Sequence, residues 1–305
     1  MVLSPLGAGR RFLPPQPGWR KEGKSQPESK CMVRTLSFSL SAVALTLLTA
    51  APGPWDDPSR EERPPRTGER VEQEGAIQQA EGVPREFYFS RVQYTSYGRG
   101  FGWGRGRWAT DFPKADRIFL SFIDRLLSNL DAYEHEHVIR LDEPSVRRFP
   151  FLYALEVGSM ALTEPEIVGL RDYLLAGGFL VIDDFWGSRQ WANWEYQIQS
   201  VLPGYEIVDL SLDHPIFTAF YEIDEILQVP NVRNGVRGGP THQSDGYVPM
   251  VKGIHDENGR LMVVINWNTD LGDAWEWADN PYYPLKYSTY AYEMGVNMIV
   301  YAMSH

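Results

Sequence analysis

The chain has almost no cysteine. Cys31 is its one cysteine, and it stands directly before a second methionine, Met32. The sequence from Met32 onward can therefore form no disulfide within itself and offers no thiolate metal ligand and no thiol nucleophile. Reactions that proceed through a sulfur nucleophile are excluded from that part of the chain.

Basic residues are also scarce. The whole chain carries a formal net charge of −11, and residues 85–305 hold 18 Lys and Arg against 30 Asp and Glu, a net charge of −12. Nucleic-acid affinity depends on neutralising phosphates with basic side chains. We therefore expect no nucleic-acid partner.

A long hydrophobic run is missing near the N-terminus. The apolar stretch 36–48 follows Arg34 and precedes small residues at 49–51, whereas a membrane-spanning helix needs roughly 20 apolar residues. A basic start, a short apolar run and small residues are the layout of a secretory signal peptide. We predict that residues 1–31 are an upstream extension, that 32–51 are a signal peptide, and that the protein is exported to the periplasm or the extracellular space. The alternative is a membrane anchor through residues 33–51.

Residues 52–84 are rich in Pro, Gly and mixed charge and have few large apolar side chains. Such a segment cannot bury enough surface to offset the entropy lost on ordering, so it is predicted to be a disordered linker. The remaining residues, 85–305, are predicted to form a single α/β domain.

Strand and helix patterns alternate along this domain. Strands are predicted at 87–94, 137–141, 151–157, 179–183 and 206–210, and helices at 114–130, from Thr163 to Gly177, and at 188–202. The continuous apolar run 179–183 is typical of a strand buried on both faces of a parallel sheet. A hairpin over 250–267 and a closing helix over 288–303 follow. The order predicts a doubly wound, mostly parallel sheet.

Several blocks of the domain, including YFSRVQY, LRDYLLAGGFLVIDDFWG, GRLMVVINWNTDLGDAWEWAD and YEMGVNMIVYAMSH, resemble a bacterial family known as domain of unknown function 4159. That family is grouped with the class I glutamine amidotransferase-like superfamily, so the resemblance implies a flavodoxin-like α/β fold in an exported or membrane-attached protein. Catalytic members of the superfamily carry a cysteine on a tight turn after a core strand, completed by a histidine and a carboxylate. Here that strand leads into Asp183 and Asp184, so glutamine hydrolysis is not expected.

Asp183 and Asp184 end the 179–183 strand, where ligands bind in open α/β sheets. Such a pair can act as general base, metal ligand or acceptor for sugar hydroxyls, and His214 in the Asp213-His214-Pro215 turn is a candidate partner. In the alternative, one carboxylate caps the helix near Ser188 and the other pairs with an arginine. Asp183, Asp184 and His214 are thus the candidate catalytic residues.

Further polar and aromatic residues are predicted to reach the same end of the sheet. The glycine-rich segment 98–108 could cradle an anion, and the loop 268–279 combines carboxylates with tryptophans, which suits a sugar or Ca²⁺ or Mg²⁺. The candidate ligand-binding residues are Arg105, Arg107, Trp108, Asp111, Glu156, Trp186, Asp270, Asp273, Trp275 and Glu276.

The leading hypothesis is a non-catalytic module that binds a small polar ligand, such as a glycan, or that assembles with an envelope protein. The alternative is a carboxylate- or metal-dependent hydrolase that uses Asp183 or Asp184 with His214. No cofactor is required by the sequence, although the oxygen-rich loop would suit a divalent cation. Oligomeric state and metal identity are left open by the sequence.

Overall fold

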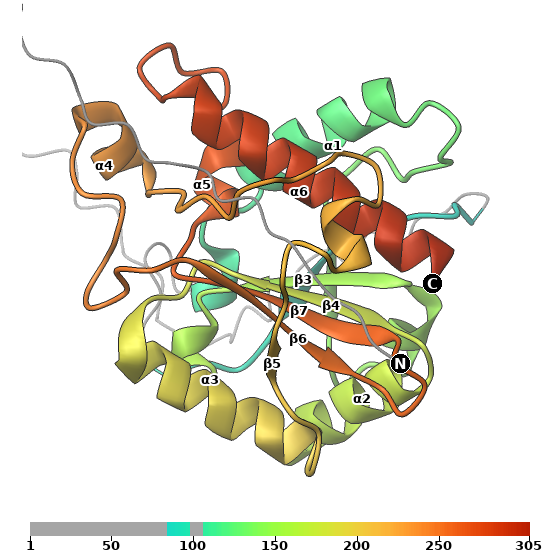
Figure 1. Ribbon diagram of the computed structural model, residues 1–305. Coiled ribbons are helices and arrows are strands. Elements are labelled where there is room, and N and C mark those ends of the chain that lie inside the picture. Colours follow the sequence, from blue (N-terminus) through green and yellow to red (C-terminus); the bar gives the residue numbers. More distant parts are fainter. Residues whose placement is uncertain (1–83, 98–105) are drawn as a thin grey trace, which may run out of the picture. The chain divides into compact units, whose positions relative to one another are not determined.

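The computed structural model describes residues 84–97 and 106–305 (Figure 1). The predicted extension, signal peptide, membrane anchor and linker, up to residue 83, lie outside the described residues, and so does Arg105. Within the described ranges, no helix is both long enough and apolar enough to span a membrane.

The sheet has seven strands in the described part of the chain, in the order β2-β1-β3-β4-β7-β6-β5. The strands are β1 (Ser90–Gln93), β2 (His137–Arg140), β3 (Phe151–Leu155), β4 (Phe179–Asp183), β5 (Val208–Asp209), β6 (Met250–His255) and β7 (Leu261–Trp267). The first five in spatial order pair in parallel, and β6 and β5 extend the sheet through antiparallel pairing, with β5 at the edge. The predicted mostly parallel, flavodoxin-like fold is confirmed.

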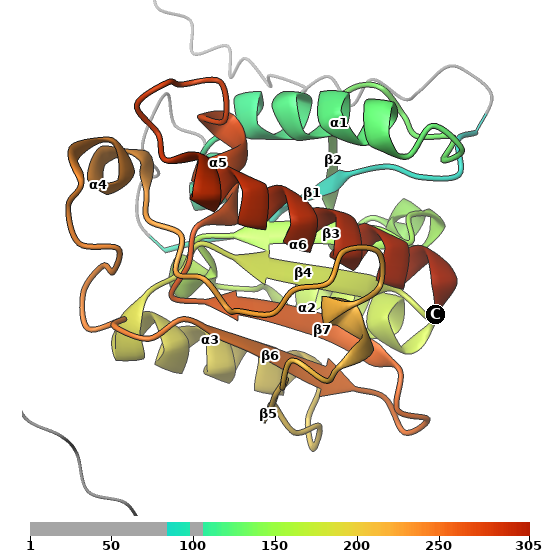
Figure 2. The ribbon, with the colours of Figure 1, turned by 45° about the horizontal axis from the view of Figure 1, so that its top comes forward.

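Helices cover both faces of the sheet (Figures 1 and 2). One face carries α1 (Lys114–Leu126), α5 (Leu271–Glu276) and α6 (Leu285–Ser304), and the other carries α2 (Glu164–Leu175) and α3 (Gly187–Val201). The short helix α4 (Val232–Arg237) and four 3-10 turns complete the described helices: η1 (Arg107–Ala109), η2 (Pro144–Arg148), η3 (Val157–Ser159) and η4 (Pro215–Phe217).

Side-chain alternation along the central strands builds the two cores. In β3, Phe151 and Tyr153 pack with the α1/α5/α6 layer, whereas Leu152 and Ala154 pack with the α2/α3 layer. All of β3 and β4 is buried, as expected when both faces of a parallel sheet are covered. Successive residues point to opposite faces, so β4 sends its last residue, Asp183, toward the α1/α5/α6 layer.

Most predicted elements are present, with shifted ends. The predicted capping box opens α2: the Thr163 backbone N–H donates to Glu166 Oε2 at 2.8 Å. The strand predicted over 206–210 is reduced to the two residues of β5. The segment 268–279, predicted as a loop, contains α5, because the Asp270 side chain accepts the Asp273 N–H at 2.8 Å and caps a helix there.

Candidate functional site

A pocket of about 760 Å³ lies where the parallel strands of the sheet finish, which we call the carboxyl end. Its lining comes from segments that follow β1, β3, β4 and β7 and from the loops beside α3 and α4. The described lining residues are Tyr97, Arg107, Thr110, Asp111, Glu156, Gly158, Ser159, Asp184, Trp186, Arg189, Gln190, Asn193, Asn231, Gln243, Ser244, Asp245, Asp270 and Asp273.

The paired strands β3 and β4 end at the same level, and this brings their next residues together. Leu155 pairs with Asp183, and the Glu156 N–H donates to the Asp184 carbonyl at 3.1 Å. Glu156 and Asp184 both leave their strands in the left-handed region, with φ of 54° and 44°. Parallel pairing and these sharp turns together place two acidic residues side by side at the pocket.

Backbone strain is concentrated around this pocket. Asp111, Glu156, Asp184 and Ser244 all have positive φ, and all four line the cavity. Non-glycine residues in this region are uncommon and cost of order 1–3 kcal/mol each, and they cluster at functional sites. The fold therefore maintains an unfavourable backbone where the pocket is built.

Asp183 faces away from the pocket. Its carboxylate accepts the Tyr153 hydroxyl at 2.6 Å and the Leu271 and Gly272 N–H groups at 3.2 and 3.0 Å. Burial raises the pKa of Asp183 to about 6, although these hydrogen bonds oppose the shift. Asp183 thus links β4 to the first turn of α5, and its side chain does not line the pocket.

Asp184 lines the pocket. It is 6% exposed, and its Oδ1 accepts the indole N–H of Trp186 at 2.8 Å. Burial raises the pKa of Asp184 well above its usual range, and the nearby Glu156 and Asp111 carboxylates raise it further. Of the two adjacent aspartates, Asp183 is therefore hydrogen-bonded within the fold, whereas Asp184 lines the pocket.

Asp184 belongs to a cluster of carboxylates. Asp111, Asp184 and Asp270 each offer an oxygen within 4.8 Å of the others, and Asp111, Asp273 and Glu276 form a second such group. Burial and the neighbouring carboxylates raise the pKa of Asp111 and Asp270 well above the usual range. Oxygen-rich clusters of this kind match the ligands of Mg²⁺ and Ca²⁺.

Two cationic side chains near the cluster, Arg91 and Arg107, already have acidic partners. Arg91 and Asp116 form a fully buried ion pair, with Arg91 Nε 3.2 Å from Asp116 Oδ2. Arg107 Nη1 lies 3.2 Å from Glu156 Oε1 at the pocket wall. These pairs leave the Asp111–Asp184–Asp270 group without an ion pair among the described residues.

A comparison with family models matches residues 88–303 to a family described as Domain of unknown function (DUF4159). This chain belongs to the DUF4159 family. The matched range contains every described pocket residue. A search of curated proteins found no match to the chain.

His214 of this DUF4159 domain lies at the opposite, amino end of the sheet. Its Nε2 is 3.3 Å from Nε2 of His255, and the Ile216 N–H donates to its Nδ1 at 3.2 Å. His255 pairs with Leu261, the first residue of β7, which runs parallel to β4. The predicted convergence of His214 with Asp183 and Asp184 is therefore not found, because the chain after β5 returns to the amino end.

The predicted aromatic residues have mostly structural surroundings. Trp275 is 1% exposed, stacks on Phe119 at a ring separation of 4.2 Å and donates its N–H to the Ala291 carbonyl. Trp108 is half-buried, packs near Phe112 and is not among the lining residues. Of the predicted aromatic residues, Trp186 alone lines the DUF4159 pocket.

Several lining residues were not predicted. They are Tyr97, Thr110, Gly158, Ser159, Arg189, Gln190, Asn193, Asn231, Gln243, Ser244 and Asp245.

Asp245 reaches the pocket from a loop that is distant in the sequence. Its carboxylate accepts the Ser188 N–H at 3.0 Å and so caps α3. This contact requires glycine at 187, where φ is 71° and a Cβ would lie 1.9 Å from Asp245 Oδ1. The glycine after Trp186 was visible in the sequence, but its distant partner was not.

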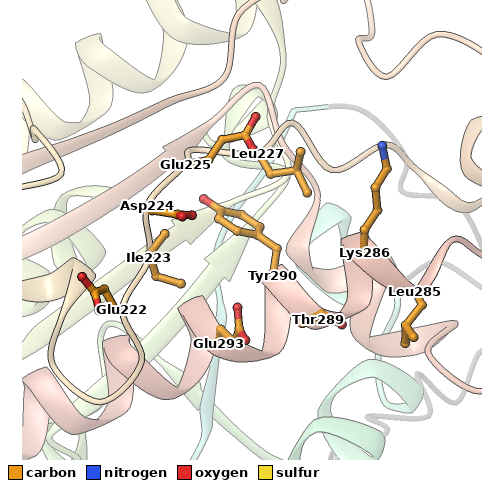
Figure 3. A pocket seen from close by; sticks show the side chains of 10 residues that line it. All are labelled: Glu222, Ile223, Asp224, Glu225, Leu227, Leu285, Lys286, Thr289, Tyr290 and Glu293. Carbon is orange, nitrogen blue, oxygen red and sulfur yellow. The ribbon is translucent and has the colours of Figure 1, made fainter.

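A second concavity of about 440 Å³ lies between α6 and the segment before Val229 (Figure 3). Carboxylates gather on its walls, and Tyr290 and Lys286 extend from α6. Burial and then Asp224 raise the pKa of Glu293 there. No residue with positive φ lines it, so the pocket at the carboxyl end is the stronger candidate site of the DUF4159 domain.

Proposed function

We propose that the DUF4159 domain of this chain is a binding module for a small, hydroxyl-rich ligand, with carbohydrates as the favoured class. The observation that most supports this proposal is a set of polar side chains that line the pocket and make no hydrogen bond to described residues. Tyr97, Thr110, Arg189 and Gln243 line it, and their side chains make no hydrogen bonds to described residues. They can therefore bond a ligand without breaking internal contacts.

Other lining side chains are held in place. Gln190 accepts the Trp186 N–H at 2.7 Å, Asn193 donates to the Met160 carbonyl at 2.9 Å, and Asn231 caps α4. A pocket with a fixed polar wall and a few adaptable groups is typical of small-ligand sites. Tyr97 is 63% exposed at the edge, where a sugar ring could stack on it.

The carboxylates supply the complementary acceptors. Glu156, Asp184 and Asp270 line the same cavity, and carboxyl oxygens accept hydrogen bonds from hydroxyl groups in either protonation state. This acidic lining disfavours a phosphate-rich ligand and favours neutral polyols and sugars. We also propose that the protein is exported and acts in the cell envelope. This part of the proposal rests on the signal-peptide pattern of residues 32–51 and not on the pocket.

A hydrolase is the second candidate, and one observation favours it. Burial raises the pKa of both Asp184 and Glu156, and the ion pair with Arg107 opposes that rise at Glu156. A protonated acid next to an ionised carboxylate is the arrangement used for general acid–base catalysis. His214 has no part in this version, which would rest on carboxylates alone.

The test is calorimetric titration of the full chain with a panel of neutral monosaccharides and disaccharides. We expect binding by the wild type and at least about a tenfold loss of affinity for Tyr97→Ala or Gln243→Ala, since each removes one ligand contact. Tyr196→Ala is the matched control, because Tyr196 is 70% exposed on α3 and does not line the pocket. Equal affinity for all variants, or no binding by the wild type, would reject the proposal; release of cleaved sugar would favour the hydrolase.

A further inference from the structure

We propose that Asp111, Asp184 and Asp270 together bind one divalent cation of the oxygen-preferring kind, Mg²⁺ or Ca²⁺. The site requires no sugar and goes beyond the binding module proposed above. Three segments distant in the sequence supply the ligands: the turn before α1, the end of β4 and the cap of α5.

The spacing of the three carboxylates fits such an ion. One oxygen of each lies within 4.8 Å of the others. Ca²⁺–oxygen distances are about 2.3–2.6 Å and Mg²⁺–oxygen distances about 2.0–2.1 Å, so two ligands of one ion lie at most about 4–5 Å apart. The three oxygens can therefore contact a common ion with little rearrangement.

Free carboxylate oxygens are the second observation that points to a ligand. Asp111 Oδ2 is fully buried and has no hydrogen-bond partner among the described residues. Asp184 and Asp270 use Oδ1 for the Trp186 and Asp273 N–H groups, and no donor in the described part of the chain reaches their Oδ2 atoms. A buried acceptor such as Asp111 Oδ2 is rarely left without a partner in a native fold, so it calls for an explanation.

The balance of charges around the three carboxylates also favours a bound cation. Asp184 is 6% exposed and Asp270 is 3% exposed, and Arg91 and Arg107 are paired with Asp116 and Glu156. Buried like charges without a counter-charge are costly, and they are relieved by protons or by a metal ion. A divalent cation would neutralise most of this charge.

The second carboxylate group is a weaker site. Asp273 Oδ2 already accepts the Val232 N–H at 2.7 Å, and although burial raises the pKa of Asp273 and Glu276, the nearby Lys114 opposes that rise. Those acids therefore have partial compensation that Asp184 and Asp270 lack. We assign the ion to Asp111, Asp184 and Asp270 for this reason.

An ion at this position would face the open side of the pocket, since all three ligands line it. Water would complete its coordination, as is usual for Mg²⁺. If the proposed function holds, a ligand hydroxyl could replace one of these waters.

The test uses the full chain, freed of metal with a chelator and titrated with Mg²⁺ or Ca²⁺ alone in a calorimeter. We expect one ion per chain and a melting temperature that rises with ion concentration. Asp111→Asn is the diagnostic variant, because Asn tolerates positive φ and keeps the shape of the side chain. It should lose at least about tenfold in affinity, the loss caused by removing even an outer-shell partner.

The metal-free melting temperature of Asp111→Asn should be equal to or above that of the wild type, which separates a lost ligand from a lost fold. Asp245→Asn is the control: it lines the same pocket outside the three-carboxylate group and should bind the ion normally. No heat with either ion, or unchanged affinity in Asp111→Asn, would overturn the proposal. Because no sugar is present, this outcome is independent of the carbohydrate titration.

Discussion

The two ends of the sheet handle their polar groups in opposite ways. At the amino end, the Arg260 guanidinium donates to the carbonyls of Leu174, Gly177 and Gly178 at 3.0–3.2 Å and to Asp256. At the carboxyl end, oxygens of Asp111, Asp184 and Asp270 lie close together, and the buried Asp111 Oδ2 has no donor among the described residues. Arg260 at the amino end thus has its hydrogen bonds satisfied, whereas the Asp111–Asp184–Asp270 group at the carboxyl end has an acceptor without a described donor.

This difference separates stability from function. Saturated polar groups contribute to the free energy of folding, whereas unsatisfied ones cost free energy unless a ligand completes them. Strained, non-glycine backbone is also found at the carboxyl end, at Asp111, Glu156 and Asp184. We infer that the fold is stabilised at the amino end and is kept open for binding at the other.

The largest expected effect comes from Asp183, which lies at the carboxyl end but is saturated. Asp183→Ala would leave the Tyr153 hydroxyl and the Leu271 and Gly272 N–H groups without their acceptor. We expect a loss of about 3 kcal/mol in the free energy of unfolding, measured by urea denaturation. Asp172→Ala, on the exposed side of α2, is the control and should change little. A loss below about 1 kcal/mol would mean that Asp183 does not hold α5 in place.

At the amino end, Arg260→Ala removes the donor to three carbonyls at the end of α2. The expected loss is about 2 kcal/mol in the free energy of unfolding, with cation and ligand affinity unchanged. Arg189→Ala is its counterpart at the carboxyl end, where the side chain is exposed and makes no hydrogen bond to described residues. It should preserve stability and weaken ligand binding. The reverse pattern would contradict the division between the two ends.

At the pocket itself, removing a charge should stabilise the protein. Asp184→Asn keeps an acceptor for Trp186 and tolerates positive φ, but it relieves repulsion from Glu156 and Asp111. We expect a gain of about 1 kcal/mol in chelator-treated protein, determined from urea midpoints at constant m-value. Without the chelator, saturating Mg²⁺ or Ca²⁺ should reverse the order, because the wild type alone has a complete ligand set. Destabilisation in the chelator would show that the carboxylates are already compensated.

Local sequence patterns predicted much of the scaffold and part of the site. The apolar run 179–183 marked a buried strand, so the acids after it, together with Glu156, were expected at the carboxyl end. Parallel strands finish at one edge, and this rule alone brings Glu156 and Asp184 together. The strand predicted over 206–210 is present only as β5, because pairing is limited to Val208 and Asp209, which are both exposed.

What the sequence did not show depends on long-range geometry. Asp183 and Asp184 have the same chemistry; strand alternation turns them to different sides, but the packing of α5 against Asp183, which makes it the structural residue of the pair, was not visible in the sequence. The loop with Gln243 and Asp245 reaches the pocket through a contact with Ser188, 57 residues earlier. His214 was assigned to the wrong end because the direction of the chain after β5 cannot be read from local patterns.

The smallest expected effect concerns pH, and it has opposite signs at the two ends. Burial lowers the pKa of His214 and His255 at the amino end. The titratable groups that face these two histidines are each other, His305 and Asp256. The unfolded chain then binds more protons, so the stability of the amino end is complete above about pH 6.5 and declines as the pH falls. At the carboxyl end, burial raises the pKa of Asp183 to about 6, so its contribution to stability is complete below about pH 3.8 and is lost as the pH rises toward 6.

At the amino end, His255→Gln should reduce the loss of stability at acidic pH by about 0.5 kcal/mol, a value discounted for the partial exposure of both histidines. Urea denaturation of the wild type and this variant between pH 4 and 7, with Asp183→Asn as the opposite case, measures both slopes; equal slopes in all three proteins would show that the two ends do not differ in proton binding.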